Sequence, residues 1–479
     1  MKNFRLGQFV FGVVGCVAIG GCALGPDYRR PLLDMPVAYP EHIGTGATSA
    51  TVVPAIPFDW WTLYGDATLN QLVTEALKKN TDIKVAVAQM DEAEALLRQT
   101  SASFFPEIDL GATGTRARVS NVLATPNPPS APLIRNDRRV ALSTSFEIDF
   151  WGKLRRGSEA ANAQVLATAY GREVVMLTLV STTVQAYFSL RSLDAQITAS
   201  LSSLKSREES LDVVRSRADA GLVSDLDVNQ AVGARADLAA QVKELERQRT
   251  IALHQLALIT VNADLRLPRG DIESLPIPPV PPAGLPSALL DRRPDIRVAE
   301  QNLIAANAQI GIAKAALFPT LSLTGSYGGQ SAALENLLES GGRIWSTGFG
   351  LALPIFDAGR NLARVAQVES REQQSLFLYQ RAVAIAFREV ADAITNVRQS
   401  AVTEADLQIR VSAARNSLEL ARARYESGYS AYLDVLDAQR TVNDAELALV
   451  RNRQSQLAYS VDFIKALGGG WNSSALYDN

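Results

Sequence analysis

Two segments of the chain, residues 140–150 and 345–355, alternate between apolar and polar or small residues. Alternation with a period of two predicts strands with one apolar and one polar face. Weaker alternation over 107–118 and 320–328 predicts two further strands, the first beginning where Pro106 disfavours continuation of a helix. The pattern therefore predicts four strands. A half-buried sheet in a soluble protein is the commoner source of such a pattern, and it stays open at this point.

Long segments without proline predict helices between and after these strands. Starting at Val228, apolar residues recur at alternating steps of three and four as far as Ile259, at eight of ten positions, and the same holds from Val435 to Ala466. This is the spacing of coiled coils, although a soluble helical bundle remains an alternative. A helix of about 65 residues would span roughly 100 Å. The predicted helices cover 66–103, 152–220, 225–262, 359–427 and 431–467.

The same order of elements occurs twice. Asp82-Ile83-Lys84-Val85-Ala86 recurs 213 residues later as Asp295-Ile296-Arg297-Val298-Ala299, and Gly221 recurs at an offset of 207 as Gly428. Matches in order at a nearly constant offset predict an internal duplication, in which each copy supplies half of a closed or symmetric object. We assign the copies to 66–265 and 295–467, with a proline-rich linker over 266–294, an irregular segment over 22–65 and a tail over 468–479.

The first 21 residues have the features of a secretory signal: Lys2 and Arg5 precede an apolar run. That run ends in Ile19-Gly20-Gly21-Cys22, which resembles a bacterial lipoprotein signal. The resemblance implies that Cys22 is acylated and becomes the mature N-terminus, whereas the alternative is an ordinary signal peptide with an incidental cysteine. Ala23 at the next position implies sorting to the outer membrane.

Composition after removal of the signal excludes several kinds of function. The mature chain carries 45 basic against 50 acidic side chains, since Lys2 and Arg5 are lost, and this balance gives no basis for nucleic-acid binding. Both cysteines lie in the first 22 residues, so the mature body has no disulfide and no thiolate metal site. The two histidines, His42 and His254, have no cysteine neighbours, and no phosphate-binding loop or nucleophile elbow occurs. We expect no cofactor, no metal and no catalytic residues.

Any membrane span should consist of strands, because no uninterrupted apolar stretch of about 18 residues follows the signal. Four strands cannot close a barrel, the smallest of which have about eight. Open sheet edges are not tolerated in lipid, so the chain is expected to form an oligomer, and a trimer would bring twelve strands. Glu147 and Asp149 are two residues apart on a predicted strand, and we expect them to line a pore rather than to act as an acid/base pair.

The chain resembles the TolC-like outer-membrane factors, most closely the NodT/OprM-type lipoproteins, over nearly the whole mature length. The resemblance implies an α+β membrane protein, a homotrimer whose twelve-strand barrel in the outer membrane is continued by a twelve-helix barrel across the periplasm. It also implies a passive exit channel for small toxic compounds, together with a periplasmic adaptor and an inner-membrane transporter of the RND type or similar. The residues that carry it include Trp60-Trp61, Glu147-Ile148-Asp149-Phe150-Trp151-Gly152-Lys153, Gly284-Leu285-Pro286-Ser287, Arg292-Arg293-Pro294-Asp295-Ile296-Arg297, Pro354-Ile355-Phe356-Asp357-Ala358-Gly359-Arg360 and Leu436-Asp437-Ala438-Gln439-Arg440.

Two helix–helix turns are the strongest candidate sites. Each has a helix-ending glycine followed by a serine that we expect to cap the next helix, features that any such turn needs. The resemblance implies that the adaptor docks at these tips. The positions concerned, with two neighbouring aspartates, are Arg217, Gly221, Leu222, Ser224, Asp227, Arg424, Gly428, Ser430 and Asp434.

The resemblance further implies that Leu433, Asp437 and Arg440 form a closed periplasmic gate. Asp437 and Arg440 are three residues apart and can share a helix face, which is equally typical of a solvated ion pair.

Three other functions remain open: a duct for type I protein secretion, a duct for metal export, and a structural coiled-coil lipoprotein that conducts nothing. The mature chain has only three methionines, which weakly disfavours a route for soft metals.

Overall fold

The computed structural model describes residues 23–32, 56–120, 122, 128, 130–279 and 289–471. These residues form two compact units. The sheet unit contains the described residues of Met1–Leu32, Gln89–Thr168 and Val298–Tyr379. The hairpin unit contains those of Leu33–Ala88, Ala169–Arg297 and Gln380–Asn479. Cys22 and His42 lie outside the described residues.

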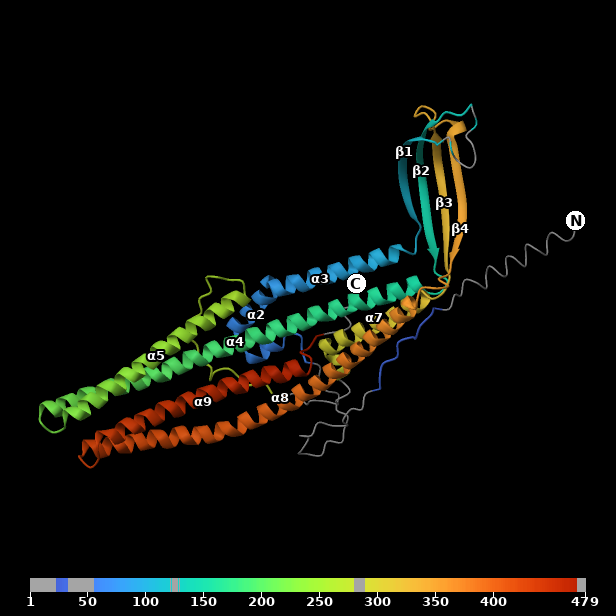
Figure 1. Ribbon diagram of the computed structural model, residues 1–479. Helices are drawn as coiled ribbons and strands as arrows, with labels where there is room; N and C mark the ends of the chain where they lie inside the picture. Colours follow the sequence, from blue (N-terminus) through green and yellow to red (C-terminus); the bar gives the residue numbers. More distant parts are fainter. Residues whose placement is uncertain are drawn as a thin grey trace. The chain divides into compact units, whose positions relative to one another are not determined.

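The sheet has four antiparallel strands in the order β1-β2-β3-β4 (Figure 1). They are β1 (Glu107–Arg118), β2 (Ile134–Ile148), β3 (Thr320–Ser331) and β4 (Arg343–Ala352). The pairing of β2 with β3 joins the two sequence copies into one sheet. Strands β1 and β4 form its edges, each paired on one side only within the described part of the chain.

Strand β2 differs most from its predicted bounds. It begins at Ile134, six residues before the predicted start at residue 140, and ends at Ile148. The early start follows from pairing, since Ile134 lies opposite Arg118 at the far end of β1. The added residues are mostly polar and do not alternate, so the sequence pattern could not predict them.

The register gives the sheet two chemically different faces. On one face Leu142 lies between Leu110 and Tyr327, and Tyr327 lies opposite Trp345. Successive strand residues point to opposite sides, so this face is apolar and the other carries mainly Ser, Thr, Gly and charged residues. The apolar face is exposed rather than packed on a core: Phe349 is 78% and Trp345 73% exposed. A half-buried sheet of a soluble protein does not account for this exposure.

The helices are α2 (Ala67–Lys79), α3 (Thr81–Ala102), α4 (Lys153–Asp219), α5 (Asp225–Ile259), α6 (Leu289–Arg292), α7 (Pro294–Ala315), α8 (Arg360–Glu426) and α9 (Tyr432–Ala466), with short 3₁₀ turns η1 (Trp60–Tyr64) and η3 (Ser340–Gly342). The single helix predicted over 66–103 is two helices, α2 and α3. They are separated by Asn80, whose ψ of 138° is not helical. Its side chain donates to the carbonyl of Ile259 at 3.0 Å, a long-range contact that sequence periodicity does not report.

The duplication is visible in the helix lengths. Helices α4 and α8 both have 67 residues, and α5 and α9 both have 35. In the hairpin unit each long helix and its shorter partner form a hairpin, with both turns at the same end (Figure 1). By length and composition one 18-residue window of α4 could cross a membrane, with a mean hydropathy of 1.3. Since 56% of that window is buried within the protein, it has the character of a core helix.

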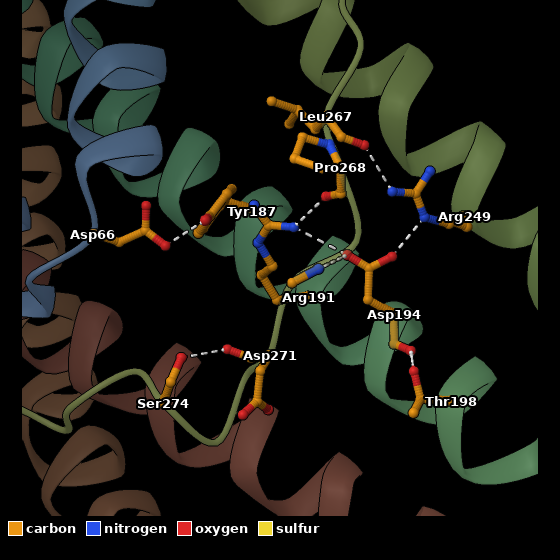
Figure 2. A network of polar contacts seen from close by, with 11 residues as sticks. Asp66, Tyr187, Arg191, Asp194, Thr198, Arg249, Leu267, Pro268, Asp271 and Ser274 are labelled. Atoms are coloured by element: carbon orange, nitrogen blue, oxygen red, sulfur yellow. Dashed lines mark hydrogen bonds and ion pairs between the residues drawn. The ribbon is translucent and has the colours of Figure 1, made fainter. Parts of the chain in front are cut away.

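A buried ionic network joins α4, α5 and the segment that follows α5 (Figure 2). Asp194 on α4 is fully buried and accepts from Arg191 at 3.1 Å and from Arg249 of α5 at 2.5 Å. Arg191 also donates to the carbonyl of Pro268 at 2.8 Å, and Arg249 to that of Leu267 at 2.9 Å. A buried carboxylate with two guanidinium partners is stable because its charge is compensated. The network therefore fixes this part of the linker to the first hairpin.

Candidate functional site

The turn between α4 and α5 closes as the sequence predicts. Gly221 has a φ of 72°, which favours glycine. The N–H of Leu222 donates to the carbonyl of Arg217 at 2.9 Å, the bond that closes a Schellman motif. Ser224 then caps α5, accepting from the N–H of Leu226 at 3.1 Å.

The turn between α8 and α9 has the same backbone but a different cap. Gly428 has a φ of 78°, and the N–H of Tyr429 donates to the carbonyl of Arg424 at 2.8 Å. The N-cap of α9 is Ala431, which provides no side-chain hydrogen bond. The prediction that Ser430 caps this helix is therefore wrong: the offset of 207 places Ala431, not Ser430, at the position of Ser224. The Ser430 hydroxyl is buried and has no partner within the described part of the chain.

Arg217 connects the two tips. Its guanidinium donates to the last carbonyls of α8, those of Tyr425 at 3.1 Å and Glu426 at 3.3 Å, and lies 4.9 Å from the centre of the Tyr425 ring. A cation is favourable at a helix C-terminus, where carbonyls lack helical partners. Arg424, the equivalent residue of the second copy, has an exposed side chain that forms no hydrogen bond with the described residues.

Two tyrosines form an apolar centre behind the tips. The rings of Tyr425 and Tyr432 are 5.2 Å apart, and both are buried against Leu211 and Val214 of α4. Burial, with a smaller contribution from Tyr425, raises the pKa of Tyr432 to about 12. Burial also raises the pKa of Tyr425, although the nearby Arg217 opposes the shift. Both phenols therefore stay neutral near pH 7 and act as packing groups.

The predicted gate residues form an exposed stripe on α9. Leu433, Asp437 and Arg440 are spaced by four and three residues, which places them on one helix face. Leu433 is 56% exposed, and Arg440 donates to Asp437 at 3.0 Å with both side chains 68% exposed. An exposed ion pair of this kind contributes only about 0.2–1 kcal/mol. The stripe is thus free to contact another chain.

A cavity of about 180 Å³ opens between the two hairpins above the tips. Polar contacts join the hairpins here: Arg422 donates to Ser206, and Gln439 donates to Ser210 at 2.9 Å. The carboxylates of Glu209 and Glu426 also line the cavity. The surface near the tips is therefore hollowed, and its lining combines the Tyr425 and Tyr432 rings with acidic groups and the side chain of Arg422.

The predicted pore residues Glu147 and Asp149 have different positions. Glu147 is on the polar face of β2 and pairs with Lys153 at 3.0 Å. Asp149 lies beyond the strand and accepts the N–H groups of Leu154 and Arg155 in the first turn of α4, each at 3.0 Å. The prediction that Asp149 is a strand residue is wrong, because a carboxylate that satisfies two N–H groups of a helix start is held there as a cap.

Five further charged residues of the polar face were missed. By the register, the following lie on the same face as Glu147: Glu107 and Asp109 of β1, and Arg135, Asp137 and Arg139 of β2. Counting in steps of two along β1 and β2 would have found them.

Solved structures define the class of protein. The chain is similar to the outer-membrane channel OprN, with a TM-score of 0.85 at 30% identity over 94% of this chain and 100% of that one. It is also similar to the CmeC outer-membrane channel of Campylobacter jejuni, with a TM-score of 0.85 at 28% identity over 95% of this chain and 96% of that one. The fold predicted from the sequence is confirmed: it is that of the trimeric TolC-like outer-membrane channels.

Sequence comparison gives the family. The family described as "Outer membrane efflux protein" matches residues 72–261 and 285–469, and the chain belongs to it. The solvent efflux pump outer membrane protein SrpC of Pseudomonas putida is 34% identical over 467 residues, covering 95% of this chain and 97% of that protein. The outer membrane protein OprJ of Pseudomonas aeruginosa is 34% identical over 460 residues, covering 95% of this chain and 94% of that protein. This chain is therefore an efflux channel protein of the outer membrane that extends into the periplasm.

Proposed function

We propose that the protein is the passive exit channel of a tripartite pump for small toxic compounds, without catalytic activity of its own. Relatives named for solvent, toluene and antibiotic efflux support this range of cargo. The energy for transport comes from an inner-membrane transporter of the RND type or similar, which a periplasmic adaptor joins to this channel.

The single observation that carries the proposal is the sheet with an exposed apolar face and two open edges, β1 and β4. In lipid the unpaired N–H and C=O groups of these edges must find partners. Three copies that pair β4 of one chain with β1 of the next give a closed barrel of twelve strands. The polar face, including Glu147, then surrounds the conduit.

Adaptor docking is proposed at the tips. The cavity beside Ser206 and Tyr425 is open, and Arg424 leaves its guanidinium without a partner from the described residues. A helical hairpin of the adaptor that carries basic and small residues fits such a surface, because Glu209 and Glu426 lie in its lining. The docking residues are Arg217, Gly221, Leu222, Ser224, Asp227, Arg424, Gly428, Ser430 and Asp434.

A lipid anchor on Cys22 is part of the proposal. The residues that follow it are held firmly in the sheet unit: the N–H of Leu24 donates to the carbonyl of Trp151 at 3.0 Å, and Arg30 pairs with Glu300 at 2.6 Å. The first contact holds Leu24 beside the junction of β2 and α4. We propose that acyl chains on Cys22, two residues earlier, enter the inner leaflet near this junction. Labelling with radioactive palmitate should mark the wild type and not Cys22→Ser; label on the variant contradicts the anchor.

The gate is proposed at Leu433, Asp437 and Arg440, where three copies of the α9 stripe meet. Arg440→Ala removes the ion pair at each copy, so trimers in planar bilayers should conduct several times more current than wild type. The matched control is Arg247→Ala, which removes another exposed pair of residues three apart, that with Glu244, from α5 far from the tips. Equal currents from wild type and Arg440→Ala contradict the gate assignment.

The efflux role is tested in a deletion strain. Loss of the gene should lower the inhibitory concentrations of solvents, dyes and antibiotics severalfold, and a plasmid copy should restore them. Unchanged susceptibility together with a defect in protein secretion or metal export would contradict the proposed cargo. No defect at all would favour a structural role.

A further inference from the structure

Four arginines gather at the end of the sheet that is away from the helices: Arg116 and Arg118 on β1, Arg138 on β2 and Arg343 on β4. The register places all of them on the apolar face. Arg138 is two residues from Val140, which shares a pairing row with Gly329 and Arg343. Arg116 lies opposite Asn136, two residues from Arg138 in the other direction. The apolar face therefore ends in a basic patch.

No carboxylate of the four strands shares this face. Glu107, Asp109, Asp137 and Glu147 all have odd positions in β1 and β2 and point to the polar side. Asp137 accepts from Gln330 at 2.9 Å on that side. The four guanidinium charges of the basic patch are thus uncompensated by strand residues. Arg138 also donates to the carbonyl of Ala332 at 3.0 Å.

An apolar hollow adjoins the basic patch. It has a volume of about 250 Å³, and its lining includes Leu110, Val140, Leu142, Tyr327, Leu338 and Arg343. Leu338 is 86% exposed and belongs to the loop between β3 and β4. That loop passes so close to the sheet that a Cβ at Gly329 would lie 2.0 Å from the carbonyl oxygen of Leu337, so only glycine fits there.

We propose that the basic patch and the hollow together bind a phosphorylated glycolipid of the outer leaflet. Because the helices extend into the periplasm, this end of the sheet lies at the outer surface of the membrane, where such lipids form the leaflet. An acyl chain fills the hollow, and Arg343 holds a phosphate at its rim with the bidentate geometry that guanidinium groups favour. By strand spacing Arg138 lies about 12 Å away, which suits a second phosphate on the same disaccharide headgroup.

A free anion would need the arginines but not the hollow, and an apolar lipid would need the hollow but not the arginines. The combination of both favours a lipid that is anionic and acylated. This assignment concerns the lipid-facing side of the sheet and does not depend on cargo, adaptor or gate.

The test is lipid binding to the purified trimer, measured by native mass spectrometry with bis-phosphorylated lipid A as the probe. Arg138→Gln/Arg343→Gln should bind at least tenfold more weakly than wild type. The control, Arg135→Gln/Arg139→Gln, removes the same charge from the polar face and should bind within twofold of wild type. The same spectra report whether each variant assembles.

Two further probes separate the sources of phosphate. Lipid A without its phosphates should bind wild type at least tenfold more weakly, and inorganic phosphate at millimolar concentration should not displace the phosphorylated lipid. Leu338→Gln, at an exposed loop position, should weaken lipid binding severalfold without affecting assembly. Three results would each overturn the proposal: wild-type affinity in the Arg138/Arg343 variant, an equal loss of affinity in the control variant, or displacement of the lipid by inorganic phosphate.

Discussion

The two helical hairpins have the same lengths but different interiors. In the first, α4/α5, the buried Asp194 joins Arg191, Arg249 and the linker segment after α5. In the second, α8/α9, the positions of Asp194 and Arg249 are occupied by Ala401 and Gln456. The duplication thus preserved the helices, whereas only one copy has the ionic network.

The difference suggests that the two hairpins have different roles when the channel opens. At the place of the network the second hairpin has neutral donors: Gln456 donates to the carbonyl of Ser400 at 3.0 Å and to Glu404 at 2.8 Å. The gate stripe of Leu433, Asp437 and Arg440 belongs to this second hairpin. We therefore expect the first hairpin to be the fixed part and the second to be the part that moves when the gate opens.

The largest expected effect is that of Asp194→Ala. It leaves Arg191 and Arg249 buried without their carboxylate, which should cost about 3–5 kcal/mol of unfolding free energy. Guanidinium denaturation of the purified protein measures it.

The matched control for Asp194→Ala is in the second hairpin. Arg415→Ala breaks the pair with Glu446 that joins α8 to α9 at 2.6 Å, but the Arg415 side chain is 64% exposed. It should cost less than about 1 kcal/mol. Equal costs for the two variants would mean that the hairpins do not differ as proposed.

The network also shows what the sequence could and could not predict. Arg235 and Arg249 were the two polar positions in an otherwise apolar coiled-coil pattern. Arg235 pairs with Glu208 at the surface at 2.7 Å, whereas Arg249 reaches the buried Asp194. The pattern marked both residues as exceptions, but choosing between them needs the partner on α4, 55 positions away in the sequence.

Periodicity predicted the helices and strands correctly where the residue type depends only on whether a position is buried or exposed. The four strands and the long helices follow from it, because one face of each differs from the other. It failed at the first residues of β2, which are set by pairing with β1, and at Asn80, which is set by a contact with Ile259. The functional positions at the tips came from resemblance, since a turn requires glycine whatever it binds.

A second prediction concerns the tyrosines of the second tip, which the first lacks: Ala218 and Asp225 occupy the positions of Tyr425 and Tyr432. The pKa of Tyr432 is raised from 10.0 to about 12 in the folded protein. Below pH 10 the phenol is neutral in both states and its full contribution is present. Between pH 10 and 12 the phenol ionises in the unfolded state but stays neutral in the folded state, so the free energy of unfolding falls by up to about 2–3 kcal/mol.

The Tyr432→Phe variant has no phenol at this position, so its free energy of unfolding should fall less between pH 10 and 12 than that of wild type. Denaturant midpoints measured from pH 9 to 12 give the comparison. Tyr429→Phe, at a position that is 80% exposed, should keep the wild-type dependence. Parallel pH profiles for wild type and Tyr432→Phe would show that burial of this phenol does not matter for stability.

The smallest expected effect distinguishes the two turns by their caps. Ser224→Ala removes the acceptor for the N–H of Leu226 and should cost about 1 kcal/mol. Ala431 has φ and ψ of −75° and 155°, close to the −84° and 153° of Ser224, so its backbone is already that of a cap. Ala431→Ser should therefore add an acceptor for the N–H of Leu433 and stabilise the start of α9 by a similar amount.

Hydrogen exchange in the first turns of α5 and α9 measures the effect of each cap. The N–H of Leu226 should exchange faster in Ser224→Ala, and that of Leu433 should exchange more slowly in Ala431→Ser. Ser430→Ala is the control, since its hydroxyl caps nothing. If Ala431→Ser slows exchange at Leu433 but leaves the conductance of the trimer unchanged, the order of this first turn does not control the gate. Faster exchange in Ala431→Ser would instead mean that the start of α9 is held by contacts other than its cap, and that the two turns differ in more than one side chain.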